Sequence, residues 1–283
     1  MTVLEVIQKS SEFLAKKGVE SPRLQTELLL AHVLKLPRMK LYLNFERALT
    51  DAEADTLREM VKWRGQRKPL QHIVGSTSFC GLEIAVNPHV LVPRPETELL
   101  GEAGWQFLLT LNSQLSTALD FGTGSGCIAI ALAMKCPAAR ITATDVSEEA
   151  LTVARQNAAR HGVTDRISFA LGDGFAALPA NARFNLIISN PPYIPTADIA
   201  SLEPEVRDFD PHSALAAGTD GLDFFRRLAA EAPERLQPGG KIMLEFGDGQ
   251  ANAVQKEFES QKWIVEAVRD DYTQRQRILI ARR

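Results

Sequence analysis

The sequence predicts an α/β fold in which helices cover both faces of a mostly parallel, seven-stranded sheet. A small helical domain and a β-hairpin linker are expected to precede this sheet. Between Thr2 and Gly65, strand signals are absent and apolar residues recur at helical spacing. From about residue 117 to the end, short apolar runs alternate with helical segments, which is typical of parallel sheets.

The composition is that of a soluble globular protein. The 283 residues are 45% hydrophobic and 24% charged, which is enough apolar material for a sizeable core. There is no run of about 18 uncharged apolar residues and no secretory pattern at the start, so we expect a cytoplasmic protein without membrane contact. The net charge of -3 gives no overall attraction to nucleic acid. Cys80, Cys127 and Cys136 lack metal-ligand spacing and are expected to be free thiols.

The helical domain is expected at residues 1–68, with four or five short helices. Ser21 followed by Pro22 is typical of an N-cap with proline at the first helical position, and Thr50 with Glu53 matches a capping box. A basic cluster near its end is either a local nucleic-acid face or, as charge runs usually are, a solvated helix end. That cluster comprises Arg58, Lys62, Trp63, Arg64, Arg67 and Lys68.

Alternating apolar residues with interspersed glycine and proline predict the β-hairpin linker at residues 69–92. The larger domain is expected at residues 93–283, opening with an amphipathic helix from Pro93 to about Leu111. The last two strands follow each other without a long helix, so we expect an antiparallel pair there. Strands are expected at 117–121, 140–144, 167–171, 184–189, 241–246, 264–269 and 277–281.

A glycine-rich turn follows the first of these strands. Glycines permit a positive φ and let a ligand approach the backbone closely, so a nucleotide-like ligand is predicted here. The GxGxG spacing differs from the GxGxxG of dinucleotide-binding turns, and close helix packing is the alternative interpretation. The predicted binding residues are Gly122, Thr123, Gly124, Ser125 and Gly126, preceded by Asp120 and Phe121.

Acidic residues follow the next two strands. Asp145 ends the second strand, where a carboxylate can accept both hydroxyls of a ribose; a plain helix N-cap is the alternative. After the third strand, Asp173 and Gly174 repeat this geometry. Asp173 is predicted to accept an adenine amino group, or else to start a turn.

The most informative segment is Asn190-Pro191-Pro192-Tyr193, which follows the fourth strand. Two prolines fix φ and remove backbone donors, which leaves the Asn190 side-chain oxygen and the Pro191 carbonyl as rigid acceptors for an NH2 group. Amide nitrogen is a poor nucleophile, and two such acceptors can orient it and offset developing positive charge. Tyr193 would lie against the planar group and exclude water. A structural diproline loop is the alternative.

Together these motifs resemble the class I S-adenosylmethionine-dependent methyltransferases, and more closely the protein-(glutamine-N5) methyltransferases that act on peptide chain release factors. The resemblance covers nearly the whole chain. It implies a Rossmann-like fold and S-adenosylmethionine as the cofactor. The segments that carry it, besides the helical N-terminal domain, are Pro69 to Gly75, Pro93 to Glu98, Gly122 to Gly126, and Asn190 to Tyr193.

The resemblance also implies roles for residues. Asn190 and the Pro191 carbonyl would hold the glutamine amide of a Gly-Gly-Gln loop while Pro192 and Tyr193 contact it, which makes Asn190, Pro191 and Tyr193 the catalytic candidates. Arg94 and Glu96 would shape the cofactor pocket. The cofactor itself would contact the glycine turn, Asp145, Asp173, Gly174 and Asn190.

Methyl transfer from a sulfonium needs little acid–base chemistry, so no catalytic histidine is required. The histidines lack metal spacing, and no metal is predicted. They are His32, His72, His89, His161 and His212.

Two positions depart from the family pattern. Family members often carry an aromatic residue at the position of Gly174, and Phe175 is the candidate replacement for adenine stacking. They also often carry an Asp-Arg pair where this chain reads Gln274-Arg275-Gln276-Arg277.

Four other functions remain open from the sequence. A ribosomal-protein glutamine methyltransferase would share the same motifs, and Pro93 to Glu98 is the segment that argues against it. An adenine-N6 methyltransferase could stack Tyr193 on a flipped base, but a stronger basic groove would be expected, so no direct nucleic-acid substrate is predicted. A noncatalytic S-adenosylmethionine-binding module would bind cofactor without turnover. A nicotinamide oxidoreductase is disfavoured by the glycine spacing.

Overall fold

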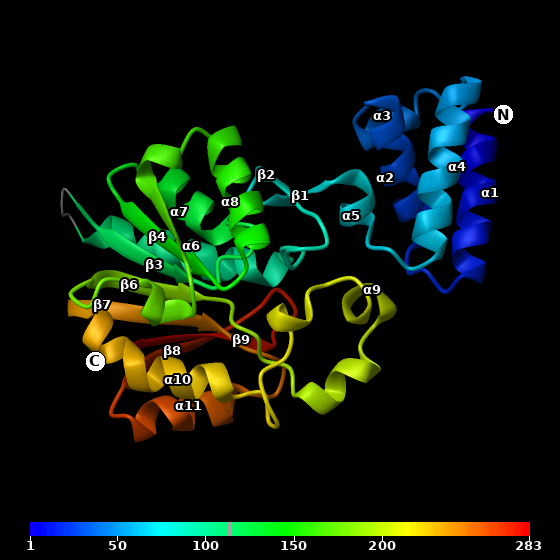
Figure 1. Ribbon diagram of the computed structural model, residues 1–283. Coiled ribbons are helices and arrows are strands. Elements are labelled where there is room, and N and C mark those ends of the chain that lie inside the picture. The colour runs from blue at the N-terminus through cyan, green and yellow to red at the C-terminus, as the bar shows by residue number, and fades with distance from the viewer. Residues whose placement is uncertain (112–114) are drawn as a thin grey trace. The chain divides into compact units, whose positions relative to one another are not determined.

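The computed structural model describes residues 1–111 and 115–283. The chain divides into two compact units (Figure 1). The helical unit comprises Met1–Ser76 together with Glu203–Phe209, and the α/β unit comprises Thr77–Leu202 and Asp210–Arg283. The boundary lies beyond the expected domain end at residue 68, and the return of residues 203–209 to the helical unit was not predicted.

Four helices lie before residue 66 in the helical unit, as the sequence predicts. Their inward faces form a core that includes Val3, Leu14, Leu29 and Leu57. The expected hairpin linker begins with a further short helix instead of a strand, and Gly75 ends that helix with a left-handed backbone. The helices are α1 (Val3–Lys16), α2 (Pro22–Leu34), α3 (Arg38–Leu41), α4 (Asp51–Gly65), α5 (Leu70–Val74) and α9 (Pro204–Arg207).

Helix α4 begins with the predicted capping box, in which Thr50 and Glu53 exchange hydrogen bonds of 3.3 and 2.9 Å. The expectation for α2 was only half right. Pro22 is its first residue, but Ser21 has a left-handed backbone with φ 46° and its side chain makes no capping hydrogen bond.

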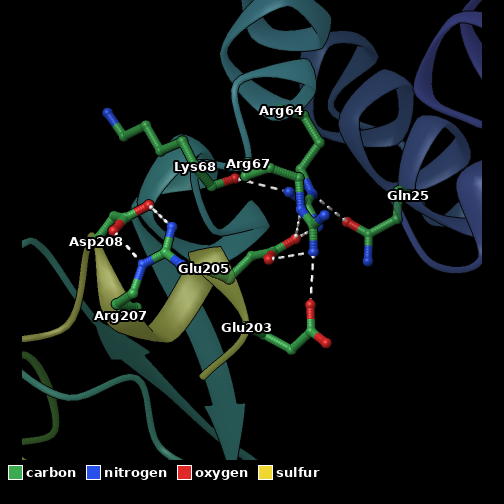
Figure 2. Close-up of polar contacts among 8 residues, drawn as sticks. All are labelled: Gln25, Arg64, Arg67, Lys68, Glu203, Glu205, Arg207 and Asp208. Carbon is green, nitrogen blue, oxygen red and sulfur yellow. Dashed lines mark hydrogen bonds and ion pairs between the residues drawn. The ribbon is translucent and has the colours of Figure 1, made fainter. Parts of the chain in front are cut away.

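The returning segment is held in the helical unit by an ion-pair cluster (Figure 2). Glu205 accepts hydrogen bonds from Arg64 at 2.7 Å and from two nitrogens of Arg67 at 2.7 and 2.6 Å. The buried Arg64 also donates to Gln25 and to the Lys68 carbonyl. Two members of the predicted basic cluster are therefore partners of an acidic segment within this unit.

The α/β unit contains the hairpin of β1 (Ser76–Phe79) and β2 (Leu82–Ala85), then α6 (Pro95–Thr110) and a seven-stranded sheet. The strand order is β5-β4-β3-β6-β7-β9-β8, parallel except for β9, which is antiparallel to both of its neighbours. The strands are β3 (Thr117–Phe121), β4 (Arg140–Asp145), β5 (Ile167–Leu171), β6 (Phe184–Ser189), β7 (Leu236–Glu245), β8 (Ile264–Asp270) and β9 (Gln276–Arg282).

Side chains alternate between two cores along the strands, so that Ala118 faces one core and Leu119 the other. The longer helices α6, α7 and α8 pack on the first core and α10 and α11 on the second, which confirms the predicted three-layer α/β fold (Figure 1). The remaining helices are α7 (Cys127–Lys135), α8 (Glu148–Arg160), α10 (Asp223–Glu231), α11 (Ala251–Ser260), and the 3-10 turns η1 (Thr164–Arg166), η2 (Gly174–Ala177), η3 (Thr196–Ser201), η4 (His212–Ala214) and η5 (Ala232–Arg235).

Within residues 1–111 and 115–283, no helix combines the length and apolarity needed to cross a membrane.

Candidate active site

A pocket in the α/β unit lies where β3, β4, β5 and β6 end. Because these strands are parallel, the turns that follow them meet at one edge of the sheet, where open α/β folds bind ligands. Segments around Val90 and Pro211 complete the wall. The predicted site residues that line it are Arg94, Gly122, Thr123, Gly124, Ser125, Asp145, Asp173, Gly174, Asn190, Pro191 and Pro192.

Four residues given a site role from the sequence lie outside this wall: Glu96, Gly126, Phe175 and Tyr193. Gly126 has φ 81°, and a Cβ there would come 3.0 Å from the Cβ of Ala154 in α8. Its place is therefore explained by helix packing, the alternative considered for this turn. Tyr193 packs against the second core, and burial raises the pKa of its hydroxyl to about 12.

The glycine turn is braced from beneath by Asp120. This fully buried carboxylate accepts hydrogen bonds from the Thr123 hydroxyl at 2.7 Å and the Ala129 amide at 3.1 Å. Burial raises its pKa to about 7. Gly122, with φ 73°, has open space where a Cβ would stand, so the backbone faces the pocket without obstruction.

Asp145 is fixed by two backbone amides. Its Oδ2 accepts from Gly124 at 2.8 Å and its Oδ1 from Ser147 at 3.0 Å, and the residue lines the pocket. The N-cap of α8 is Ser147, whose hydroxyl accepts from Ala150 at 3.0 Å. The N-cap alternative considered for Asp145 is therefore wrong, and its carboxylate joins the glycine turn to the end of β4.

Aromatic side chains lie beside the third turn, but not as expected for Phe175. Phe175 is buried and its ring packs at 5.2 Å from that of Phe121, which itself lines the pocket. Gly174 lies against Phe121, because a Cβ at Gly174 would come 2.2 Å from that ring. The Asp173 carboxylate forms an ion pair with Arg227.

The loop after β6 is held by contacts that the sequence did not predict. Asn190 Nδ2 donates to Thr97 Oγ1 at 3.0 Å, and Thr97 Oγ1 donates to Glu245 Oε2 at 2.7 Å. Glu245 is the last residue of β7 and is 2% exposed. Burial raises its pKa to about 7, although hydrogen bonds from Thr97 and Asn190 act in the opposite direction. The Tyr193 carbonyl accepts from Gln250 at 2.9 Å.

Besides the ion pair of Asp173 with Arg227, a further ion pair lies at the pocket wall. Arg94 donates to the buried Asp210 at 2.8 Å, just before Pro211 joins the pocket lining. Burial raises the pKa of Asp210 to about 6, against the effect of Arg94. In the part of the chain that the structure describes, no group of three or more potential ligands could hold a metal ion.

Known proteins with similar sequences decide between the interpretations that share this geometry. A protein named release factor glutamine methyltransferase from Geobacter sulfurreducens is 46% identical over 89% of this chain and 87% of its own length. One of the same name from Deinococcus radiodurans is 42% identical over 100% of this chain and 99% of its own. The chain belongs to the release factor glutamine methyltransferase family. The resemblance stated from the motifs is thereby confirmed.

Two family models match separate parts of this family member. Residues 5–75 match the model described as PrmC N-terminal domain, and residues 102–201 match the Methyltransferase small domain. A crystal structure of a methyltransferase from Pyrococcus furiosus has a TM-score of 0.51 and 24% identity, covering 72% of this chain and 90% of that one. At this identity the likeness supports the class I methyltransferase fold alone.

Proposed function

We propose that this enzyme transfers a methyl group from S-adenosylmethionine to the side-chain amide nitrogen of the glutamine in the Gly-Gly-Gln loop of peptide chain release factors. The observation that carries the proposal is the position of Asn190 and Pro191 in the wall of the pocket, next to the glycine turn. The family membership supports the same substrate class. The acceptor protein would be modified in the cytoplasm, where free thiols such as Cys80 remain reduced.

The residues present fit the cofactor. Gly122 and Gly124 line the pocket and have open space where side chains would stand, so a ligand can approach their backbone. Asp145 is oriented beside them as the acceptor for ribose hydroxyls. Asp173, in the turn after β5, is the acceptor proposed for the adenine amino group. When bound, S-adenosylmethionine supplies a methyl group already activated on a sulfonium.

The protein contributes orientation and electrostatics. Asn190 Oδ1 and the Pro191 carbonyl would accept hydrogen bonds from the two N–H groups of the glutamine amide, which would hold its nitrogen in one orientation for methyl transfer. Transfer would break the C–S bond of the sulfonium, which becomes a neutral thioether, as the N–C bond forms, and the nitrogen would gain positive charge. The two acceptors would stabilise that charge until the nitrogen loses a proton to water. Tyr193, which is only partly buried against the second core, is proposed to contact the substrate loop.

The decisive experiment measures transfer of labelled methyl from S-adenosylmethionine to a purified release factor. Label is expected on the native protein and not on a variant whose Gly-Gly-Gln glutamine is alanine. Label that persists on the variant would place the target elsewhere on the release factor. If label appears on a ribosomal protein or nucleic acid and not on the release factor, the labelled molecule is the substrate and the proposal is wrong.

Replacing Asn190 separates chemistry from cofactor binding. Asn190→Ala removes an acceptor that acts at the reacting nitrogen, so kcat should fall by about 100-fold. The S-adenosylmethionine Kd, measured by calorimetry, should stay within about threefold. An unchanged kcat would remove Asn190 from the proposed mechanism.

The helical domain of residues 1–68 is proposed to recognise the release factor. Its support is that the pocket wall lies entirely in the α/β unit among the described residues, which leaves the helical unit without a part in cofactor binding. Its surface can therefore make contacts with a protein substrate in addition to those proposed for Asn190 and Pro191.

A further inference from the structure

Three polar side chains form a directed series of hydrogen bonds at the pocket wall, which Thr97 and Asn190 line and behind which Glu245 is buried. Thr97 is in the first turn of α6, Asn190 follows β6, and Glu245 ends β7. The register pairs Ser189 with Leu244, so the next residues, Asn190 and Glu245, leave adjacent strands side by side. The Thr97 hydroxyl lies between them, at 3.0 Å from Asn190 Nδ2 and 2.7 Å from Glu245 Oε2.

The carboxylate of Glu245 determines which group donates and which accepts in each of these hydrogen bonds. An ionised carboxylate is only an acceptor, so the single hydrogen of the Thr97 hydroxyl must point to Glu245. The hydroxyl can then only accept from Asn190, and that requires the NH2 end of the Asn190 amide to face Thr97. The Asn190 Oδ1 is thereby left for another partner. An asparagine without such neighbours could adopt either orientation at little cost.

We propose that Thr97 and Glu245 are positioning residues that lock the Asn190 amide with Oδ1 available to the substrate nitrogen. This inference rests on the proposed function, because it gives Asn190 Oδ1 the role of substrate acceptor. With the amide reversed, its NH2 group would meet the NH2 group of the substrate. Donor would face donor, and the glutamine nitrogen would lose both its orientation and its charge stabilisation.

Burial strengthens the hydrogen bonds that orient the Asn190 amide. Glu245 is 2% exposed, and Thr97 is 3% exposed, so water does not compete for their hydrogen bonds. The other charged groups that act on Glu245 are Glu96 and Arg277, which have opposite effects on its ionisation. Hydrogen bonds from Thr97 and Asn190 favour the ionised form of Glu245, and the one from Thr97 has the larger effect.

Thr97→Val and Thr97→Ser, made in the full-length enzyme, test the lock. Valine has nearly the shape of threonine but no hydroxyl, so kcat for release-factor methylation should fall at least tenfold. The S-adenosylmethionine Kd should remain within about threefold. Serine restores the hydroxyl and should recover kcat to within about threefold of the unmodified enzyme. Thr26→Val is the matched control, since Thr26 is a buried threonine of the helical unit whose hydroxyl bonds the Pro22 carbonyl.

The outcomes are distinguishable. Unmodified enzyme that methylates the native release factor and not its glutamine-to-alanine variant supports the proposed function independently of Thr97. If Thr97→Val then keeps its kcat, the lock is wrong while the function stands. If Thr97→Val and Thr26→Val lose kcat equally, lost stability explains the effect and the positioning role is overturned. If the unmodified enzyme labels nothing on the release factor, the proposed function fails first.

Discussion

At the scale of single residues, three carboxylates organise the edge of the sheet. Asp120 braces the glycine turn, Asp145 ties that turn to β4, and Glu245 ends the chain of hydrogen bonds to Asn190. Burial raises the pKa of both Asp120 and Glu245 to about 7. Both groups therefore change charge near neutral pH, and only Glu245 is connected through Thr97 to the proposed acceptor.

This predicts how methylation depends on pH. The pKa of Glu245 is raised, so its ionised form, which fixes the Thr97 hydroxyl, is present above about pH 7 and lost below it. Protonated Glu245 can donate to Thr97 and release the direction of the chain. The kcat should therefore fall as pH decreases from 8 through about 7 to 6.

Glu245→Gln provides the control for that profile. Glutamine offers both a donor and an acceptor, so the direction is no longer forced and kcat should be reduced at pH 8. The decrease between pH 8 and 6 should become shallower, because the titrating group is gone. An unchanged profile in this variant would assign the pH dependence to another group, with Asp120 the first to examine.

Gly174 illustrates a residue fixed by packing. A Cβ there would overlap the Phe121 ring, and φ 57° is left-handed. Gly174→Ala should lower the free energy of unfolding by about 1–2 kcal/mol for the backbone and about 1–3 kcal/mol for overpacking. Gly162→Ala has φ 65° but open space and should show only the first contribution. Equal losses in urea denaturation would show that the Phe121 ring moves aside.

At the scale of elements, the sequence pattern predicted features that depend on residues adjacent in the chain, such as the bounds of strands. The apolar runs gave β3, β5 and β6 at their observed bounds, while β7 begins at Leu236 instead of 241, where its pairing with β6 shifts register. The role of Glu245 could not be predicted, because its proximity to Asn190 depends on β6 and β7 being neighbours. The N-cap expected at Ser21 was also not predicted correctly, because the left-handed backbone of Ser21 cannot be read from the residue type.

The α9 segment allows a matched test of one element's attachment. Burial opposes ionisation of Glu205, but hydrogen bonds from Arg67 and Arg64 outweigh it and lower its pKa. Glu205→Ala leaves the buried Arg64 without this partner and should destabilise the helical unit by roughly 2 kcal/mol. Hydrogen exchange in residues 203–209 should become faster.

Asp208→Ala is the control for this element. Asp208 lies in the same segment and pairs with Arg207, but about half of its side chain is exposed, so water screens the pair. Its replacement should leave both urea stability and exchange unchanged. Equal effects of the two variants would mean that the Arg64 and Arg67 contacts do not hold the segment.

At the scale of the whole molecule, the chain passes between its two units three times, after residues 76, 202 and 209. The last two passages could not be predicted, because the acidic segment 203–209 carries no helical pattern long enough to suggest a place in the first unit. Its partners, Arg64 and Arg67, belong to the basic cluster that the sequence left as either a nucleic-acid face or a solvated helix end. The pairing of Arg64 and Arg67 with Glu205 becomes visible only in the folded structure (Figure 2).

This division predicts separate responses to the two substrates. The described pocket wall belongs to the α/β unit. S-adenosylmethionine at 100 times its Kd should therefore slow hydrogen exchange of the amides near residues 122–125, 145–147 and 190–192. The exchange rate should fall by up to about 100-fold where exchange requires opening of the pocket. Amides of α1, α2 and α4 should not respond. Adding a release factor should then protect amides in the helical unit, in agreement with its proposed recognition role. Protection of α1 and α2 by cofactor alone would show that the helical unit takes part in cofactor binding, and its assignment to substrate recognition would have to be abandoned.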